Sequence, residues 1–315
     1  LAMYFVAGMN TFNMLELEAA GYTSQFQIIV FPFVFFGFAI LAGIFPFHNW
    51  SPDGHVAAPT AVSMFHAGVL MKLGAFAALR VAIMLLPEGA QVHLPWIIFL
   101  SLINVVYGAF IAMVQKDFKY MVGFSSVSHM GLVLMGFATL TRDGFLGAGL
   151  QMFSHGVMTA LFFAVVGMVY DRAHTREIPK LGGIAKVMPL VAVGFIVGGL
   201  VSMGMPGFSG FIAEFPIFMG VWGSENPYIQ YEPIIAIIAV ISIVITAAYI
   251  LRITGRVFFG DMPSEYVGKF GDVTTLDKVA VVFLCLFMVG IGIFPRLMVP
   301  VVESGVDNIM RLLGG

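Results

Sequence analysis

The chain has 315 residues, of which 60% are apolar and only 10% are charged, and its formal net charge is −2. Soluble domains typically carry about 25% charged residues, and the mean hydropathy of this chain is +0.99. These values exclude an ordinary soluble globule, a disordered tail and a nucleic-acid-binding protein, since none of these classes combines so many apolar residues with so few charged ones. The composition is typical of a chain whose main solvent is lipid.

Apolar segments of about 20 residues, enough to cross the hydrocarbon layer, recur along the whole chain. Residues 1–9 look like the end of a longer apolar span, so we expect the chain to be the C-terminal portion of a larger protein. Charge, Pro or Gly bounds each of eight further predicted spans, at 26–46, 59–86, 93–114, 119–139, 144–170, 188–222, 232–255 and 277–298. We therefore predict an all-α integral membrane protein, a multi-span helical bundle forming one transmembrane domain over residues 1–315.

The span at 188–222 is too long for a single straight helix. Its length of roughly 35 residues corresponds to about 52 Å of helix, whereas the hydrocarbon layer is about 30 Å thick. It contains the stretch MPGFSG at 205–210, in which proline removes a backbone donor and the glycines add conformational freedom. We predict a broken transmembrane helix with halves at 188–204 and 208–222, of the kind that lines a polar cavity. The alternative is a simple proline kink.

The distribution of Lys and Arg predicts the orientation. Most of these residues fall in the loops after the first, third, fifth and seventh spans, whereas the opposite side carries Arg80, Arg142, Arg296 and Arg311. The positive-inside rule places the more basic side in the cytoplasm. The C-terminus is then expected outside, where residues 303–313 could form a short amphipathic helix.

Lys72 is the one basic residue deep inside a span, with at least a dozen residues on either side of it. A charged amine near the bilayer midplane costs about 3 kcal/mol on insertion scales. The midplane is also too deep for a lysine side chain to reach the surface. Lys72 is therefore a candidate for a functional buried lysine.

Three histidines accompany Lys72. His66 lies on the same span as Lys72, and the other two lie at its depth on two other spans. His129 and His155 are near the middle of their spans, at the expected depth of Lys72, and His66 lies between Lys72 and the cytoplasmic side. A neutral imidazole accepts a proton at one nitrogen and donates from the other, so it can relay protons. Taken singly, each ring fits a structural histidine bonded to a backbone carbonyl better than a relay, and only the three together favour the relay.

Glu214 is the only acidic residue well inside a span, in the second half of the predicted broken helix and toward the outer face. It suits a proton outlet, and pairing with a partner subunit is the alternative. Lys119 lies at the cytoplasmic boundary, where it could supply protons or simply set the topology. From the cytoplasm outward, the candidate proton wire is Lys119 and His66, then Lys72, His129 and His155, then Glu214. Water molecules must bridge these groups, because hydrogen bonds reach only about 3 Å.

We expect no cofactor or metal on this chain. Its one cysteine, Cys285, lies in an apolar run, and an iron–sulfur cluster needs several ligands. The sequence also lacks a Walker loop, a strand–GxGxxG–helix unit and a hydrolase-type order of Ser, His and Asp.

Five motifs carry a family resemblance: FPFHNWSPDGHVAAPTAVSMFHAGVLMKLGAFAALR (45–80), MVQKDFKYMVGFSSVSHMG (113–131), MFSHGVMTALFF (152–163), YDRAHTREIPKLGG (170–183) and GMPGFSGFIAEF (204–215). The chain resembles the antiporter-like membrane subunits of respiratory complex I (NADH:quinone oxidoreductase), most closely the chain M type, which is related to the fourth mitochondrially encoded chain. The resemblance covers nearly the whole sequence.

The resemblance implies a fold built from two inverted repeats, of which this chain would hold the second, with its broken helix. It implies that Lys72 is the central proton-carrying lysine, Glu214 the outlet, His155 a member of the central polar axis and Lys119 a loop lysine of less defined role. It also implies that NADH, FMN, iron–sulfur clusters and quinone bind partner subunits in a bacterial inner membrane. The expected partners are lipid and the other membrane subunits of a complex I-like assembly.

The chain departs from the family pattern at two positions. Leu41 stands where the family usually has a lysine that helps to admit protons, and His66 stands where the M type commonly has an apolar residue. The leading interpretation is a proton-translocating subunit driven by redox chemistry elsewhere. The alternatives are a structural antiporter-like module that does not pump, or a subunit of a sodium/proton antiporter or membrane-bound hydrogenase.

Overall fold

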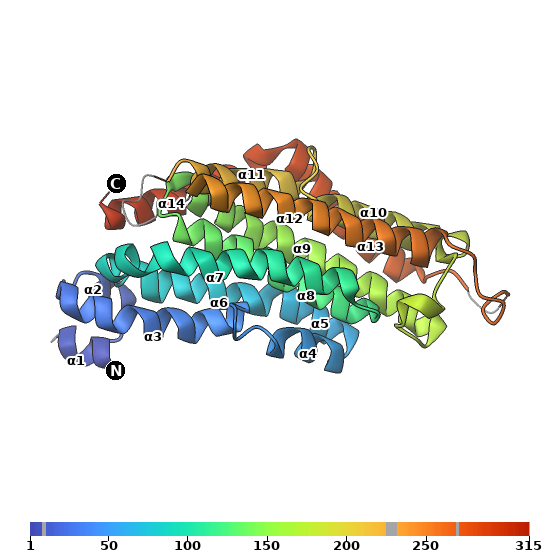
Figure 1. Cartoon of the computed structure of the whole chain (residues 1–315), viewed down its shortest axis with the longest axis horizontal. Helices are drawn as coiled ribbons and strands as arrows, with labels where there is room; N and C mark the ends of the chain where they lie inside the picture. Colours follow the sequence, from blue (N-terminus) through green and yellow to red (C-terminus); the bar gives the residue numbers. More distant parts are fainter. Residues whose placement is uncertain (8–10, 225–231, 269–270, 315) are drawn as a thin grey trace.

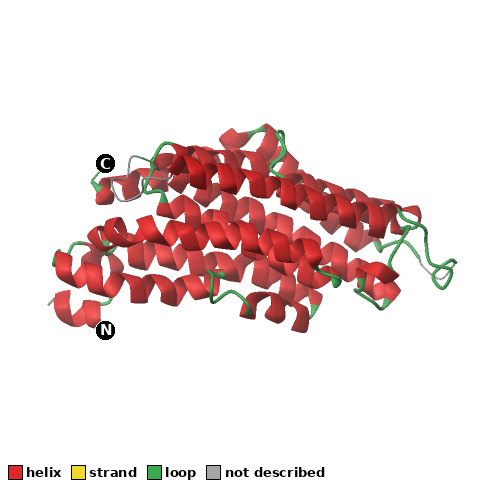
Figure 2. Ribbon diagram, in the orientation of Figure 1, coloured by secondary structure: helices red, strands yellow, loops and turns green. Residues whose placement is uncertain are grey.

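The computed structural model describes residues 1–7, 11–224, 232–268 and 271–314. Within these ranges every regular element is a helix, and a single isolated β-bridge joins Asp117 to Glu177 (Figure 2). The prediction of an all-α fold is confirmed. Residues 8 and 9, part of the first apolar segment considered above, lie outside the described residues.

The first half of the chain forms helices that run back and forth along the bundle (Figure 1). They are α1 (Ala2–Ala7), α2 (Met14–Glu18), α3 (Ser24–Ala42), α4 (Trp50–Ala57), α5 (Thr60–Phe65), η1 (His66–Leu70), α6 (Met71–Ala77), η2 (Ala78–Ile83), α7 (Pro87–Val114) and α8 (Phe118–Ala138). The second half consists of α9 (Arg142–Ala173), η3 (Ile178–Lys180), η4 (Ile184–Lys186), α10 (Pro189–Ser202), α11 (Ser209–Trp222), α12 (Glu232–Ile253), η5 (Thr254–Phe259), α13 (Thr275–Ile293), η6 (Pro295–Leu297) and α14 (Val299–Leu313).

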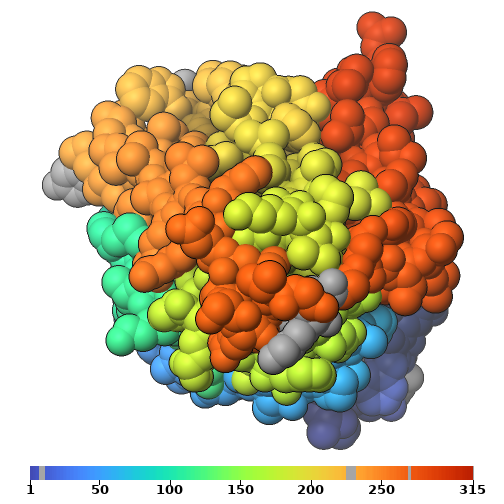
Figure 3. Space-filling view, turned by 90° about the vertical axis from the view of Figure 1, so that its right-hand side faces the viewer, coloured from blue at the N-terminus to red at the C-terminus, as the bar shows by residue number. Residues whose placement is uncertain are grey.

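Seven helical segments of the described chain are long and apolar enough to cross a membrane, and α10 and α11 are shorter apolar helices. Both termini lie at the same end of the bundle (Figure 1). The segments between α9 and α10 and between α12 and α13, yellow-green and orange in Figure 3, form much of the opposite end. Exposed Arg142 pairs with Glu303 at 3.4 Å and with Asp307 at 3.1 Å, which ties α14 to the start of α9.

The predicted break in the long span is confirmed. The chain leaves α10 after Ser202 and starts α11 at Ser209. Between them Gly204 and Gly207 adopt φ angles of +61° and +91°, which are strained for any residue with a Cβ. The segment is therefore two helices with an irregular connection, and not one helix with a proline kink.

A second break, between α3 and α4, interrupts the span predicted at 26–46. Gly43, with φ +88°, ends α3. The predicted span at 26–46 is therefore too long, because it included the apolar residues that follow this glycine. Asn104 of α7 holds this turn: its amide donates to the Gly43 carbonyl at 2.8 Å, and its carbonyl oxygen accepts from the Phe45 N–H at 2.5 Å. The backbone groups freed by the break are thus satisfied inside the protein, as a membrane interior requires.

The span that carries Lys72 is continuous but irregular. Two π-helical turns, η1 and η2, interrupt the α-helical geometry before and after α6. Such turns are rare and often lie at functional sites, because they widen the helix and leave carbonyls open to other donors.

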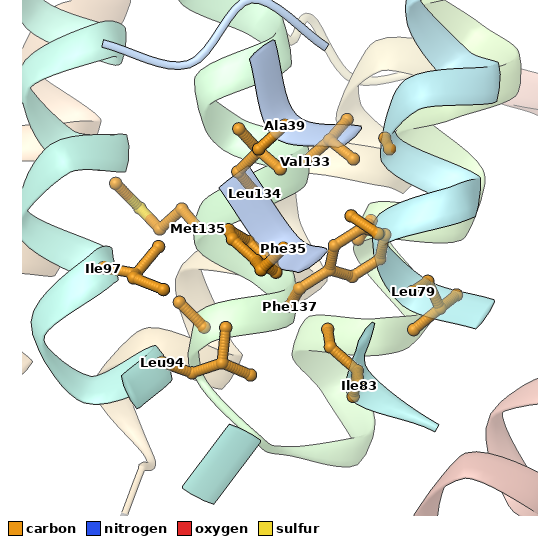
Figure 4. Packing of buried hydrophobic residues seen from close by; sticks show 14 of the residues in the cluster. Phe35, Ala39, Leu79, Ile83, Leu94, Ile97, Val133, Leu134, Met135 and Phe137 are labelled. Atoms are coloured by element: carbon orange, nitrogen blue, oxygen red, sulfur yellow. The ribbon is translucent and has the colours of Figure 1, made fainter. Parts of the chain in front are cut away.

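Helix α8 forms the centre of the bundle. It is buried along almost its whole length and packs against α7, α9, α4 and α11. Figure 4 shows its apolar end, where residues 133–137 interlock with Phe35 and Ala39 of α3, with Leu79 and Ile83 of η2, and with α7. This close packing fixes the rotation of α8 and so the direction of the polar side chains one to three turns earlier.

Candidate functional site

Lys72 lies in α6 and is only 8% exposed. Its ammonium donates to the carbonyl oxygen of Ala67, a carbonyl of the π turn η1, and its Nζ lies 2.7 Å from Nδ1 of His155 on α9. When the amine is the donor, His155 accepts at Nδ1 and carries its own proton on Nε2. The buried lysine therefore has two polar partners and no need to reach the membrane surface.

His155 and His129 form a stacked pair. Their ring centroids are 5.2 Å apart and the rings are inclined by 10°. His129 Nδ1 lies 2.8 Å from the Ser125 carbonyl oxygen, and its Nε2 lies 3.1 Å from the Ser202 carbonyl oxygen on α10. Both nitrogens of His129 thus face acceptors, and both can donate when the ring carries two protons.

Glu214 follows the second break, on α11, and is 3% exposed. Its Oε1 lies 3.6 Å from Nε2 of His129 and accepts a hydrogen bond from the Gln151 amide at 3.2 Å. Gly204 makes this position possible, because a Cβ there would lie 2.7 Å from Glu214 Oε2. The glycine that opens the break therefore also leaves space for the carboxylate.

The structure thus brings together four of the six residues singled out from the sequence. They form one buried series from α6 through α9 and α8 to α11: Lys72, His155, His129 and Glu214. Ser154 on α9 and Ser209 at the start of α11 bond to each other at 2.8 Å beside it.

The other two residues lie apart from this series. His66 stacks on His55 and on Trp50, with ring centroids 4.1 Å and 5.1 Å away. Lys119 is buried and donates to the carbonyl oxygen of Ala58, just after α4. They occupy the region of α4, between the buried series and the end of the bundle opposite the termini (Figure 1).

Sequence reasoning missed three buried polar residues of this region. Gln151 bonds to Glu214, and Tyr249 of α12 bonds through its hydroxyl to Ser125 at 2.8 Å. His55 lies on α4 and is completely buried. A signal for Gln151 was present, since it is one helical turn before His155 and so on the same face of α9.

Leu41, at the end of α3, packs against the helix that carries Lys72. A Cβ on Gly74 would lie 2.9 Å from the Leu41 Cβ. The described residues contain no group of three or more His, Cys, Asp or Glu side chains that could hold a metal ion.

Comparison with known proteins identifies relatives of this chain. The family described as NADH:quinone oxidoreductase/Mrp antiporter, TM, matches residues 1–246. NAD(P)H-quinone oxidoreductase chain 4 of Gloeobacter violaceus is 34% identical over 314 residues, which are 99% of this chain and 60% of the relative. NADH-quinone oxidoreductase subunit M of Rickettsia prowazekii is 35% identical over 310 residues, 98% of this chain and 62% of the relative. The chain thus spans about 60% of the length of these relatives.

Solved structures show the same fold. A chain of respiratory complex I from Thermus thermophilus superimposes with a TM-score of 0.90 and 29% identity, over 99% of this chain and 65% of that one. A chain of the Mrp complex from a Dietzia species superimposes with a TM-score of 0.85 over 99% of this chain and 66% of that one, and at 21% identity it shows the fold alone. The resemblance predicted from the motifs is confirmed: this chain belongs to the NADH:quinone oxidoreductase/Mrp antiporter transmembrane family.

Proposed function

We propose that this chain is a proton-translocating membrane subunit of a complex I-like NADH:quinone oxidoreductase. The names of its relatives support membership of such an enzyme. The observation that carries the proposal is the buried series of contacts from Lys72 to Glu214, which crosses four helices of the bundle. Ionisable residues inside a membrane are expensive, so a series of them marks an ion pathway.

In this proposal the proton moves from Lys72 to His155, then through His129 to Glu214. The first transfer has a direct hydrogen-bond path at 2.7 Å. The two imidazoles are stacked, so a water molecule would connect their ring nitrogens. Glu214 would receive the proton at the second break and release it on the outer side.

Electrostatic coupling between neighbours would make the series respond to charge. At 3.6 Å and an effective dielectric of about 20, a charged His129 and a charged Glu214 attract each other by about 5 kcal/mol. Protonating either one therefore strongly changes the cost of charging the other. Redox chemistry elsewhere could drive protons through such a series without large helix movements.

The expected partners supply that chemistry. NADH, FMN, iron–sulfur clusters and quinone would bind other subunits, and this chain would bind lipid and neighbouring membrane subunits. We place the protein in a bacterial inner membrane with its C-terminus outside. The distribution of Lys and Arg supports this orientation, because the loops at the end opposite the termini carry most of them.

Replacing Lys72 with Met tests the proposal. The intact assembly would be reconstituted into lipid vesicles, and protons moved per electron would be measured during NADH oxidation with quinone. We expect Lys72→Met to lose the protons carried by this subunit, and Lys186→Met, at an exposed lysine of η4, to keep them. An unchanged ratio in Lys72→Met would leave the chain with a structural role only.

A further inference from the structure

A cavity between α2, η2 and α14 combines two arginines with apolar side chains. It has a volume of about 420 Å³ and lies at the end of the bundle that carries both termini (Figure 1). Arg80 of η2 and Arg311 of α14 line it, together with Glu18 and the apolar side chains of Leu15 and Met84. The cavity is therefore separate from the buried series of the candidate site.

Among the described residues, neither arginine has a carboxylate within ion-pair distance. Arg80 donates to Met84 Sδ at 3.1 Å, a weak acceptor, and Arg311 donates to the Asn308 side chain on its own helix. Arg142 at the same end differs, because two carboxylates of α14 pair with it. The fold thus neutralises one arginine of this end and leaves two others beside a shared cavity.

The charges that line the cavity favour a singly charged anion. Two guanidinium groups and the Glu18 carboxylate give the lining a formal charge of +1. A phosphodiester carries one negative charge, and its two free oxygens match the fork of N–H donors on an arginine. The cavity therefore has the charge and the donors that a phosphodiester needs.

The depth of the cavity favours a lipid as the source of this phosphate. Arg80 follows Lys72 by eight residues in the same span, which corresponds to about 12 Å of helix. Because Lys72 is expected near the bilayer midplane, Arg80 lies close to the edge of a hydrocarbon layer about 30 Å thick, just inside the level of the lipid phosphates. Leu73 and Phe76, between these two residues, are each 50% exposed, and Leu15 in the cavity wall is 69% exposed. Acyl chains thus find apolar surface next to the two cations.

We propose that this cavity binds the headgroup of an anionic phospholipid, with Arg80 and Arg311 donating to its phosphate. The two arginines come from different helices, so the bound headgroup holds α14 against the span that carries Lys72. The acyl chains extend from the headgroup along exposed apolar side chains of the bundle. This site involves no proton transfer, and it therefore stands or falls independently of the proposed function.

Photolabelling of the intact assembly tests the site. The assembly in detergent would be titrated with phosphatidylglycerol that carries a diazirine next to its headgroup, and labelled peptides of this chain would be quantified by mass spectrometry. We expect label in the segments 78–86 and 299–313. Half-saturation should rise about fivefold in Arg80→Gln and in Arg311→Gln, which corresponds to about 1 kcal/mol per arginine. Arg296→Gln is the matched control, because Arg296 is an exposed arginine of η6 outside the cavity, and it should leave the titration unchanged.

A variant that should bind more tightly separates weaker binding from misfolding. Glu18→Gln removes the carboxylate that lines the cavity, so half-saturation should fall about fivefold. Half-saturation that is unchanged in both Glu18→Gln and Arg311→Gln would refute the site. Label spread evenly over the exposed helices of the chain would refute it as well.

Competition identifies the source of the phosphate. Excess unlabelled phosphatidylglycerol should displace the label, whereas phosphatidylcholine, whose headgroup has no net charge, should displace it much less. Inorganic phosphate at millimolar concentration should leave the label in place. Displacement by inorganic phosphate would show a site for free phosphate and would overturn the assignment to a lipid, and equal displacement by phosphatidylcholine would overturn the role of the two arginines.

Discussion

The contact between α9 and the π turn η1 should control proton transfer from Lys72. Gly156 follows His155 on α9, and a Cβ added to it would lie 2.8 Å from the Gly68 carbonyl oxygen and 3.8 Å from Lys72 Cε. Carbon and carbonyl oxygen normally stay at least about 3.3 Å apart. The substitution Gly156→Ala must therefore separate the two helices by about 0.5 Å.

This displacement acts directly on the proton path. The Lys72–His155 contact of 2.7 Å would open to about 3.2 Å, the upper end of the hydrogen-bond range. A misplacement of about 1 Å costs about a hundredfold in rate, so we expect proton transfer to slow by about tenfold. Stability should change little, because alanine favours the helix by about 1 kcal/mol and overpacking costs about 1–3 kcal/mol.

The assay is proton uptake by vesicles containing the intact assembly, together with its thermal unfolding midpoint. Gly290→Ala is the matched control, because a Cβ at Gly290 on α13 has no atom within 4 Å. It should pump normally. If Gly156→Ala pumps as fast as Gly290→Ala, the spacing of α9 and η1 does not limit transfer from Lys72, and the reasoning is refuted.

Three further predictions follow from single contacts. Lys72→Arg keeps a charge that never deprotonates, so proton flux should be lost as in Lys72→Met, and normal flux would mean that a fixed charge suffices. Gly204→Ala places a Cβ against Glu214 at a φ of +61°, so the unfolding free energy should fall by about 1–3 kcal/mol. A lower thermal midpoint of the assembly would show this loss, and an unchanged midpoint would contradict it. The Lys278 ammonium, 2.5 Å from Asp272, lowers the pKa of that carboxyl; this pair stabilises the fold above the unfolded-state pKa and loses its effect as pH falls through the lowered value. Lys278→Met should therefore raise the pKa of Asp272 toward its ordinary value in an NMR titration, and an unchanged titration would contradict the pairing.

The sequence predicted the helical architecture because membrane spans must be long and apolar. It also predicted the break at 205–210, since length and Pro206 pointed to the same place. The predicted span at 26–46 was too long, because the apolar residues after Gly43 were counted as part of the helix. The helix ends there because Gly43 adopts a positive φ and the Asn104 side chain bonds to the turn that follows. Those bonds come from a helix some 60 residues later, which no local pattern contains.

The candidate site was partly predictable for a related reason. Counting residues from the ends of a span gives depth, and depth alone grouped Lys72 with His129 and His155. Contact also depends on the rotation of each helix about its axis, which packing against neighbours determines. Gln151 was overlooked because a neutral amide does not titrate, and His55 because the segment containing it was assigned to a loop between two spans.

The π turn before Lys72 has a consequence for how this side chain is aimed. A regular α-helix advances about 100° around its axis with each residue, and a π turn accommodates about one residue more. The extra residue in η1 thus sets the register of everything after it, and Lys72 faces His155 in that register. If the same residues wound as a regular α-helix without the π turn, an apolar neighbour would face α9 in place of the amine. The direction of the one deeply buried cation of this span is therefore determined by backbone winding as much as by the identity of the residue itself.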